Sequence, residues 1–241
     1  MTRRRFFAPP SAFNLSKKSV TLTTDEARHL REVLRLKPGD EVSVFDGEGK
    51  EFRARVVQAR RESAELELQN ELEPARPESP LRITLAVALL KGEKFDLVVQ
   101  KATELGVTRV VPLVTRYADI KLRDEADANK RVARWHRIAL EAAKQCGRAV
   151  VPEVCAPQPL GAILKNPCLL FSEKGGRGLT QIETDEITAI IGSEGGWSDE
   201  ELDEARAAGV EIVTLGGRIL RAETAAITAA ALLQHRFGDL K

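Results

Sequence analysis

The chain lacks the long apolar runs found in membrane proteins and secreted precursors. No run approaches the roughly 18 residues typical of a membrane-spanning helix, and the basic residues 1–7 precede no apolar stretch of a signal peptide. We therefore expect no membrane partner. The three cysteines, Cys146, Cys155 and Cys168, are an odd number without paired spacing, which is typical of reduced thiols in a cytoplasmic protein.

Common motifs for metals and nucleotides are also missing. The histidines His29, His136 and His235 are scattered, so we expect no metal site. There is no Gly-Lys-Ser/Thr phosphate loop and no Gly-x-Gly-x-x-Gly fingerprint. The glycine-rich residues 175–178 are either a flexible surface loop or a third wall of a ligand cleft. These absences disfavour an NTPase, a dehydrogenase and a metalloenzyme.

Charge is balanced overall but unevenly distributed. The 241 residues carry a net charge of +1, with 43% hydrophobic and 30% charged residues, as in an ordinary globular protein of one or two domains. Residues 91–148 hold 13 Lys/Arg against 8 Asp/Glu, whereas residues 149–241 hold 8 against 14. A basic half beside an acidic half is compatible with RNA contact on one face.

The first 70 residues have the pattern of a small β-rich unit. A helix is expected over residues 24–35, and alternating apolar residues with Gly-containing turns predict strands over 41–46, 51–57 and 63–68. A charged segment with three prolines follows. We therefore place a domain at 1–72, a linker at 73–80 and a second domain at 81–241.

The second domain alternates between strands and helices. A capping box of Ser198 and Glu201 marks one helix start, and the alternation predicts an α/β fold whose mostly parallel sheet is covered on both faces. The expected strands are 83–89, 107–114, 168–172, 187–191 and 210–215. The expected helices are 93–105, 127–146, 199–208 and 223–236.

Two glycine-rich turns each follow an apolar strand and precede a helix. They cover residues 192–196 and 216–217. Glycine permits tight turns and lets a ligand approach the backbone closely, so two such loops on adjacent strands could line one cleft. Either loop could instead be an ordinary turn of an α/β sheet.

These turns also carry a family resemblance. The sequences Ile191-Gly192-Ser193-Glu194-Gly195-Gly196-Trp197-Ser198 and Leu215-Gly216-Gly217-Arg218-Ile219-Leu220-Arg221-Ala222-Glu223-Thr224-Ala225 resemble the paired C-terminal motifs of SPOUT methyltransferases, and more narrowly those of the RsmE family. Residues 29–35, 39–40, 46–47, 91, 100–107 and 141–148 match in the same order. The family usually has proline at the position of Ser193, which bears on the rigidity of that loop.

The resemblance implies the fold and the activity. It implies a PUA-like N-terminal domain and a C-terminal methyltransferase domain tied into a deep trefoil knot, where spacing alone favours an unknotted doubly wound sheet. It further implies a homodimeric, cytoplasmic enzyme that uses S-adenosylmethionine (SAM) to methylate N3 of a uridine in 16S rRNA of the small ribosomal subunit. The alternatives are a non-catalytic RNA-binding assembly factor on the same fold and a conventional nucleotide-binding enzyme.

Candidate site residues follow from the resemblance and from the chemistry. A uracil N3 must lose its proton, which calls for a base or for a cation near the ring oxygens. Arg221 and Glu223 are the catalytic candidates, although they could instead form a structural ion pair. The cofactor candidates are Phe171, Ile191, Gly192, Glu194, Gly195, Gly196, Leu215, Gly216, Ile219, Leu220 and Arg221. The candidates for RNA contact are Arg3, Arg4, Arg5, Arg31, Arg35, Lys91, Lys101 and Arg148.

Overall fold

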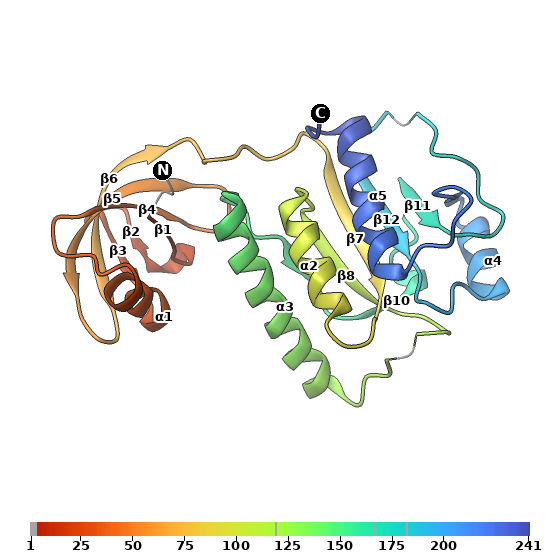
Figure 1. Ribbon diagram of the computed structural model, residues 1–241, viewed down its shortest axis with the longest axis horizontal. Coiled ribbons are helices and arrows are strands. Elements are labelled where there is room, and N and C mark those ends of the chain that lie inside the picture. Colours follow the sequence, from red (N-terminus) through yellow and green to blue (C-terminus); the bar gives the residue numbers. More distant parts are fainter. Residues whose placement is uncertain (1–3, 119, 166, 182) are drawn as a thin grey trace. The chain divides into compact units, whose positions relative to one another are not determined.

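The computed structural model of the protein describes residues 4–118, 120–165, 167–181 and 183–241 and divides into two compact units (Figure 1). The N-terminal unit comprises Met1–Glu78 together with Ala143–Val151, and the C-terminal unit comprises Ser79–Ala142 and Pro152–Lys241. The sequence pattern assigned residues 143–151 to the second domain. The structure instead groups them with the first.

The N-terminal unit is built on one six-stranded sheet, which confirms the β-rich domain. Its strand order is β1-β4-β5-β6-β3-β2, and every pair is antiparallel except β1 with β4. Alternate residues such as Val42, Val44, Ala54 and Val56 fill its core. The bounds are β1 Arg5–Phe7, β2 Phe13–Asn14, β3 Ser19–Leu22, β4 Glu41–Phe45, β5 Glu51–Ala59 and β6 Ala64–Leu72.

The helix expected over 24–35 is not continuous. It consists of α1, Thr24–Arg28, followed by a π-helical turn, η2, His29–Val33. The N–H of Leu34 reaches back to the carbonyl of His29, and the chain then passes through Arg35 at a φ of +53°. The wider π-helical turn ends the helix. The spacing of apolar residues in the sequence is that of an ordinary helix and does not predict such a turn.

Buried ion pairs explain why residues 143–151 belong to the N-terminal unit. The Arg5 guanidinium donates to the carbonyl oxygens of Ala143 (3.2 Å) and Arg148 (2.7 Å), and it pairs with Glu51 at 3.2 Å. Arg148 in turn donates to both carboxylate oxygens of Glu78. These are long-range contacts in which Arg5, Glu51 and Arg148 are buried while Glu78 reaches the surface. A buried charge is stable only when it has its partner.

The C-terminal unit contains a parallel sheet with strand order β10-β8-β7-β12-β11-β13, and β9 also pairs with β8. The parallel sheet is confirmed. Strand β11 lies between β12 and β13 and is parallel to both. The loops that follow these three strands therefore meet at the carboxyl edge of the sheet. The bounds are β7 Arg82–Ala88, β8 Arg109–Val114, β9 Glu153–Val154, β10 Gln158–Pro159, β11 Cys168–Phe171, β12 Glu186–Ile191 and β13 Glu211–Val213.

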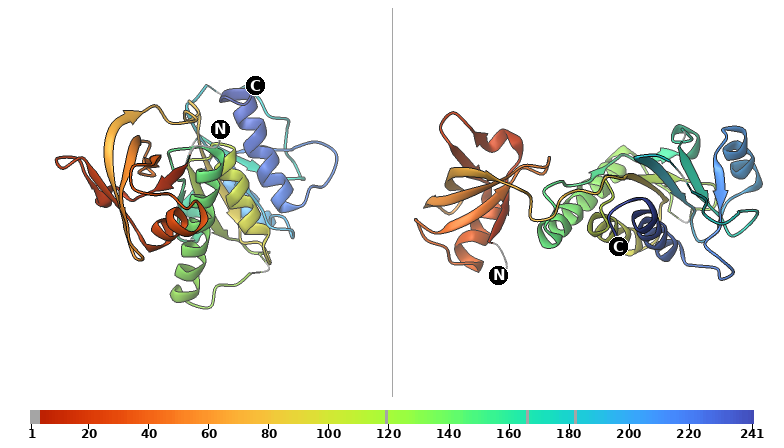
Figure 2. Two further views of the ribbon diagram at one scale, coloured as in Figure 1. Left: turned by 60° about the vertical axis from the view of Figure 1, so that its left-hand side comes forward. Right: turned by 90° about the horizontal axis from the view of Figure 1, so that it is seen from above.

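Helices cover both faces of this sheet (Figure 2). On one face, Leu202 and Ala205 of α4 pack in a core with Ile190 and Ile212. On the other, α5 packs on β12 and β7 and lies beside α2. Within the described residues, no helix combines the length and the apolarity needed to cross a membrane. The bounds are α2 Lys94–Glu104, α3 Glu125–Cys146, α4 Asp199–Ala207 and α5 Ala222–Phe237.

The capping box at the start of α4 is confirmed and gives a first testable prediction. The Ser198 hydroxyl accepts from the Glu201 N–H (3.2 Å), and the Glu201 carboxylate accepts from the Ser198 N–H (2.9 Å). Ser198→Ala should lower the free energy of unfolding by about 1 kcal/mol in urea titration. Asp203→Ala, which removes an exposed carboxylate from the same helix, should cost less than about 0.5 kcal/mol. Equal losses in the two variants would mean that the cap contributes nothing specific.

Candidate functional site

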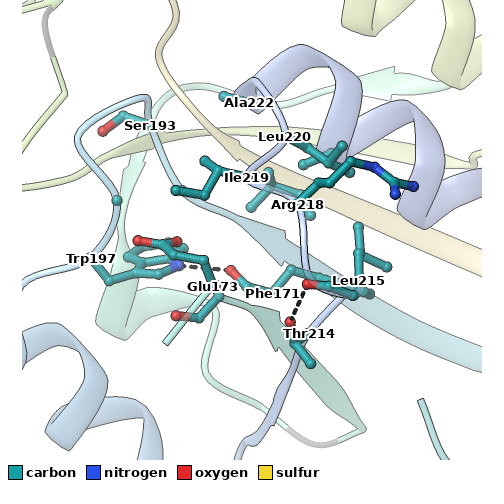
Figure 3. Close-up of a pocket in the computed structure, with 16 residues that line it drawn as sticks. Phe171, Glu173, Ser193, Trp197, Thr214, Leu215, Arg218, Ile219, Leu220 and Ala222 are labelled. Carbon is teal, nitrogen blue, oxygen red and sulfur yellow. Dashed lines mark hydrogen bonds between the residues drawn. The ribbon is translucent and has the colours of Figure 1, made fainter. Parts of the chain in front are cut away.

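One pocket lies at the carboxyl ends of β11, β12 and β13 (Figure 3). Carboxyl ends of adjacent parallel strands are the usual place for a ligand in an open α/β sheet. The structure brings the two glycine-rich turns to this pocket, together with the end of β11 and the start of α5. The lining comprises residues 171–173, 191–193, 196–197, 214–216, 218–220, 222 and 225.

The first glycine turn is shaped around the Trp197 ring. The indole N–H donates to the carbonyl oxygen of Phe171 at 2.9 Å, as drawn in Figure 3. A Cβ on Gly192 would lie 3.0 Å from Cε2 of this ring, so a side chain there would push the indole out of its place. Gly196 has a φ of +71°, and its N–H closes the turn on the carbonyl oxygen of Ser193 at 3.0 Å.

The far side of this turn rests on the segment that follows β8. The Ser193 hydroxyl donates to the Tyr117 carbonyl oxygen at 3.0 Å. A Cβ on Gly195 would lie 2.7 Å from Cβ of Tyr117, so Gly195 faces this segment and does not line the pocket. The Ser193 hydrogen bond tethers the loop at the position where the resemblance leads one to expect proline.

Glu194 also points away from the pocket. Its carboxylate forms an ion pair with the Lys94 ammonium at the start of α2, and it is absent from the lining. Of the eleven cofactor candidates, Glu194, Gly195 and Arg221 therefore lie outside the wall. The reason for Glu194 and Gly195 is the same: tertiary neighbours, Lys94 and Tyr117, occupy the outer side of the loop.

The second glycine turn supplies a mostly apolar wall. Gly216 has a φ of +109°, and its carbonyl oxygen accepts from the Thr214 hydroxyl at 3.5 Å. The Ile219 side chain is 85% exposed although it lines the pocket. An exposed aliphatic side chain at a pocket wall would lose contact with water when an apolar ligand surface lies against it.

Two charged groups belong to the lining, and of these only Glu173 lies outside the two motifs that the sequence analysis singled out. Glu173 and Arg218 both line the pocket, and Figure 3 shows Glu173 near Trp197, with Arg218 above Leu215. Glu173 lies two residues after Phe171, the end of β11, and a carboxylate just beyond a strand end is the signal that could have identified it. The pocket therefore offers an anionic and a cationic group besides its backbone.

The two catalytic candidates occupy different surroundings. Arg221 is the exposed N-cap residue of α5 and directly follows Leu220 of the pocket wall. Glu223 lines a neighbouring hollow with Asp96 and Gln100 of α2, where its buried Oε2 has no hydrogen-bond partner. No ion pair joins Arg221 to Glu223 in the described part of the chain, so the structure does not support the structural-pair alternative.

The predicted RNA contacts divide by exposure. Arg5 and Arg148 are wrong as RNA contacts, because both side chains are 5% exposed and held by the carboxylates of Glu51 and Glu78. Arg3 lies outside the described residues. The remaining candidates have side chains that reach the surface: Arg4, Arg31, Arg35, Lys91 and Lys101. Among them, Arg4, Arg31 and Lys101 also form ion pairs with carboxylates.

Comparison with known proteins agrees with this architecture. Residues 77–234 match the profile of the RNA methyltransferase domain, and residues 22–69 match that of the RNA methyltransferase PUA domain. Ribosomal RNA small subunit methyltransferase E of Synechocystis is 38% identical over 229 residues, covering 88% of this chain and 72% of that protein. The chain belongs to the ribosomal RNA small subunit methyltransferase E family. The RsmE resemblance is therefore confirmed, together with its PUA and SPOUT-like methyltransferase domains.

Two solved structures of similar proteins contain the cofactor. Ribosomal RNA small subunit methyltransferase E from Neisseria gonorrhoeae, bound to S-adenosyl methionine, is 36% identical with a TM-score of 0.88 and covers 99% of this chain and 100% of that one. A putative methyltransferase from Legionella pneumophila in complex with SAM is 32% identical with a TM-score of 0.90, and both chains are covered fully, at 100%. Both likenesses extend over the two units of this methyltransferase E family member.

Proposed function

We propose that this protein transfers the methyl group of SAM to N3 of a specific uridine in 16S rRNA of the small ribosomal subunit. The observation that carries the proposal is the pocket built by two glycine turns on three adjacent strand ends, in a member of the methyltransferase E family. Of the candidate cofactor residues, Phe171, Ile191, Gly192, Gly196, Leu215, Gly216, Ile219 and Leu220 line this pocket.

The lining fits SAM. Gly192, Gly196 and Gly216 carry no side chain, so the adenine edge and the ribose can approach the backbone of both turns closely, while Leu215 and the exposed Ile219 can cover the faces of the base. Glu173 adds a carboxylate that suits a cationic or hydroxyl-bearing part of the ligand. When bound, the cofactor supplies an already activated methyl group on its sulfonium, so the protein mainly orients the reactants.

The protein must also manage the N3 proton. Arg221 has a free, exposed guanidinium beside the pocket wall within the described structure, where it can stabilise negative charge on the uracil oxygens. Glu223 lines the neighbouring hollow and not the cofactor pocket itself. In our proposal it therefore accepts or relays the proton through water. The two side chains thus divide the charge stabilisation and the proton transfer between them.

The proposal also covers RNA binding and the place of the protein in the cell. The exposed Arg4, Arg35 and Lys91 and the half-buried Arg31 and Lys101 provide cations for phosphates. We assign RNA binding chiefly to the PUA-like domain at 1–72, joined by the linker 73–80 to the knotted domain at 81–241, from which residues 143–151 pack with the first unit. Because ribosomal subunits are its substrate, we place the protein in the cytoplasm.

We further propose a homodimer. The α5 helix has a stripe of small and apolar side chains, Thr224, Thr228 and Leu232, that is not fully covered within the chain, and exposed Leu97 lies on the neighbouring helix α2. Such a stripe allows close helix packing. Light scattering at micromolar concentration should give about twice the 26.5 kDa chain mass. A monomer that still methylates RNA would contradict this proposal.

The methylation proposal is tested by titrating the protein with SAM in a calorimeter and then adding small ribosomal subunits from cells that lack the modification. We expect one SAM site per chain and transfer of about one methyl group per subunit. A protein that binds the RNA but neither binds SAM nor transfers its methyl group would be an assembly factor, and the proposal would be wrong.

A further inference from the structure

The protein has one tyrosine, and its ring is unusually exposed. Tyr117 is 48% exposed. The rings of the described tryptophan and phenylalanine residues are buried or only partly exposed, with Trp135 and Trp197 at 3% and 6%. Leaving an aromatic ring in water forgoes the stabilisation that burial provides, and among the described Phe, Trp and Tyr residues only Tyr117 is exposed.

The backbone that carries this ring is firmly held. The carbonyl oxygen of Tyr117 accepts from the Ser193 hydroxyl at 3.0 Å, and the Ala118 N–H closes a turn on Thr115 at 3.2 Å. The preceding Arg116 donates its N–H to Glu201 (2.9 Å) and pairs with Glu200 (3.3 Å). By contrast, no hydrogen bond of the Tyr117 hydroxyl occurs in the described regions.

Tyr117 is attached to a loop that forms the edge of the proposed cofactor pocket. Ser193, which Tyr117 tethers, lines that pocket, and Cβ of Tyr117 packs directly against Gly195 in the same loop. Tyr117 follows β8, whose carboxyl end lies at the same edge of the sheet as the glycine turns. A backbone held by these hydrogen bonds therefore presents an exposed aromatic ring beside the place where a base must meet the methyl group.

We propose that the Tyr117 ring is a stacking platform for an unpaired base of the RNA substrate, either the target uridine or its neighbour. The inference rests on the proposed function and adds a substrate-binding residue to it. Proteins read unpaired RNA by stacking bases on exposed aromatic rings. Removing one such platform weakens binding by about 5- to 150-fold.

A structural role can be separated from stacking, because the nearest contacts with the glycine turn are made by Cβ and the carbonyl oxygen of Tyr117, and only Cγ of the ring lies close to Gly195, at 3.6 Å from a Cβ built there. Gly195 touches Cβ of Tyr117, and Ser193 bonds to its carbonyl oxygen. Tyr117→Ala keeps both atoms and deletes only the ring. Tyr117→Phe keeps the ring and deletes only the hydroxyl, so it is the matched control.

The kinetic test compares these two variants with small ribosomal subunits as substrate. Tyr117→Ala should raise KM for the RNA by about 5- to 150-fold and leave the calorimetric affinity for SAM unchanged, whereas Tyr117→Phe should behave like the unaltered protein. An unchanged KM for the RNA in Tyr117→Ala would overturn the inference. So would an equal loss in the phenylalanine variant, or a halved mass of the alanine variant in light scattering, which would make the ring an interface residue.

A direct readout exploits the single tyrosine. Protein grown with 3-fluorotyrosine should give one 19F resonance, and a single-stranded oligonucleotide containing the target uridine should shift it. An unmoved resonance under conditions of methyl transfer would overturn the inference. If the unaltered protein transfers no methyl group, the proposed function fails, and the 19F titration still decides whether the ring meets RNA.

Discussion

Replacing Arg221 with alanine should lower the single-turnover rate of methyl transfer by about 100- to 1,000-fold, with little change in SAM affinity. The guanidinium directly follows the pocket wall at Leu220, is exposed, and has no ion-pair or hydrogen-bond partner within the described ranges. It is thus available to the negative charge that develops on the uracil ring. Its removal should therefore destabilise the transition state more than the bound cofactor.

Two further variants make this test specific. Arg236→Ala removes a guanidinium from the other end of α5, where it donates to the carbonyl oxygen of Leu179, and should leave the rate nearly unchanged. Glu223→Gln should lower the rate and flatten its rise with pH, because an amide cannot accept the N3 proton. Near-normal rates in both Arg221→Ala and Glu223→Gln would mean that neither side chain takes part in the chemistry.

Replacing Gly192 with valine should reduce SAM affinity by more than about 100-fold. A loss of this size corresponds to about 2.8 kcal/mol of binding free energy, since each tenfold step is about 1.4 kcal/mol. A Cβ at this position would already lie 3.0 Å from Cε2 of Trp197 and 3.1 Å from its Nε1. The indole cannot easily retreat, since its N–H is bonded to the carbonyl of Phe171. The branched side chain would thus displace Trp197, which itself lines the pocket.

The matched control is Gly217→Ala in the second turn. A Cβ on Gly217 would meet no atom within 4 Å, and its φ is not in the left-handed range. This variant should bind SAM almost normally. Thermal unfolding without ligand separates a blocked pocket from a misfolded protein. A folded Gly192→Val protein with unchanged SAM affinity would remove the first glycine turn from the cofactor site.

Local patterns were sufficient for the framework of the C-terminal unit. Strand and helix periods differ clearly in the longer elements, such as β12 and α3, and Ser198 with Glu201 marks the start of α4. The meeting of the two glycine turns follows from parallel strands that share one carboxyl edge. The two-residue strands β9 and β10 are too short for an alternating pattern to show.

Side-chain direction could not be predicted in the same way, because it depends on partners far away in the sequence. Glu194 faces Lys94, a hundred residues earlier, and Gly195 faces Tyr117. Arg5 looked like part of a basic terminus, yet Glu51 and the carbonyl oxygens of Ala143 and Arg148 enclose it. A cation's availability for RNA is therefore set by tertiary packing rather than by the local charge pattern.

The most direct test of the account is nucleoside mass spectrometry of small-subunit rRNA from cells with and without the gene. We expect 3-methyluridine in the rRNA of cells that carry the gene, its loss on deletion, and its return when the unaltered protein is supplied but not when the Arg221→Ala variant is supplied. An unchanged amount of 3-methyluridine in the deletion strain, or the loss of a different modified nucleoside instead, would contradict the account.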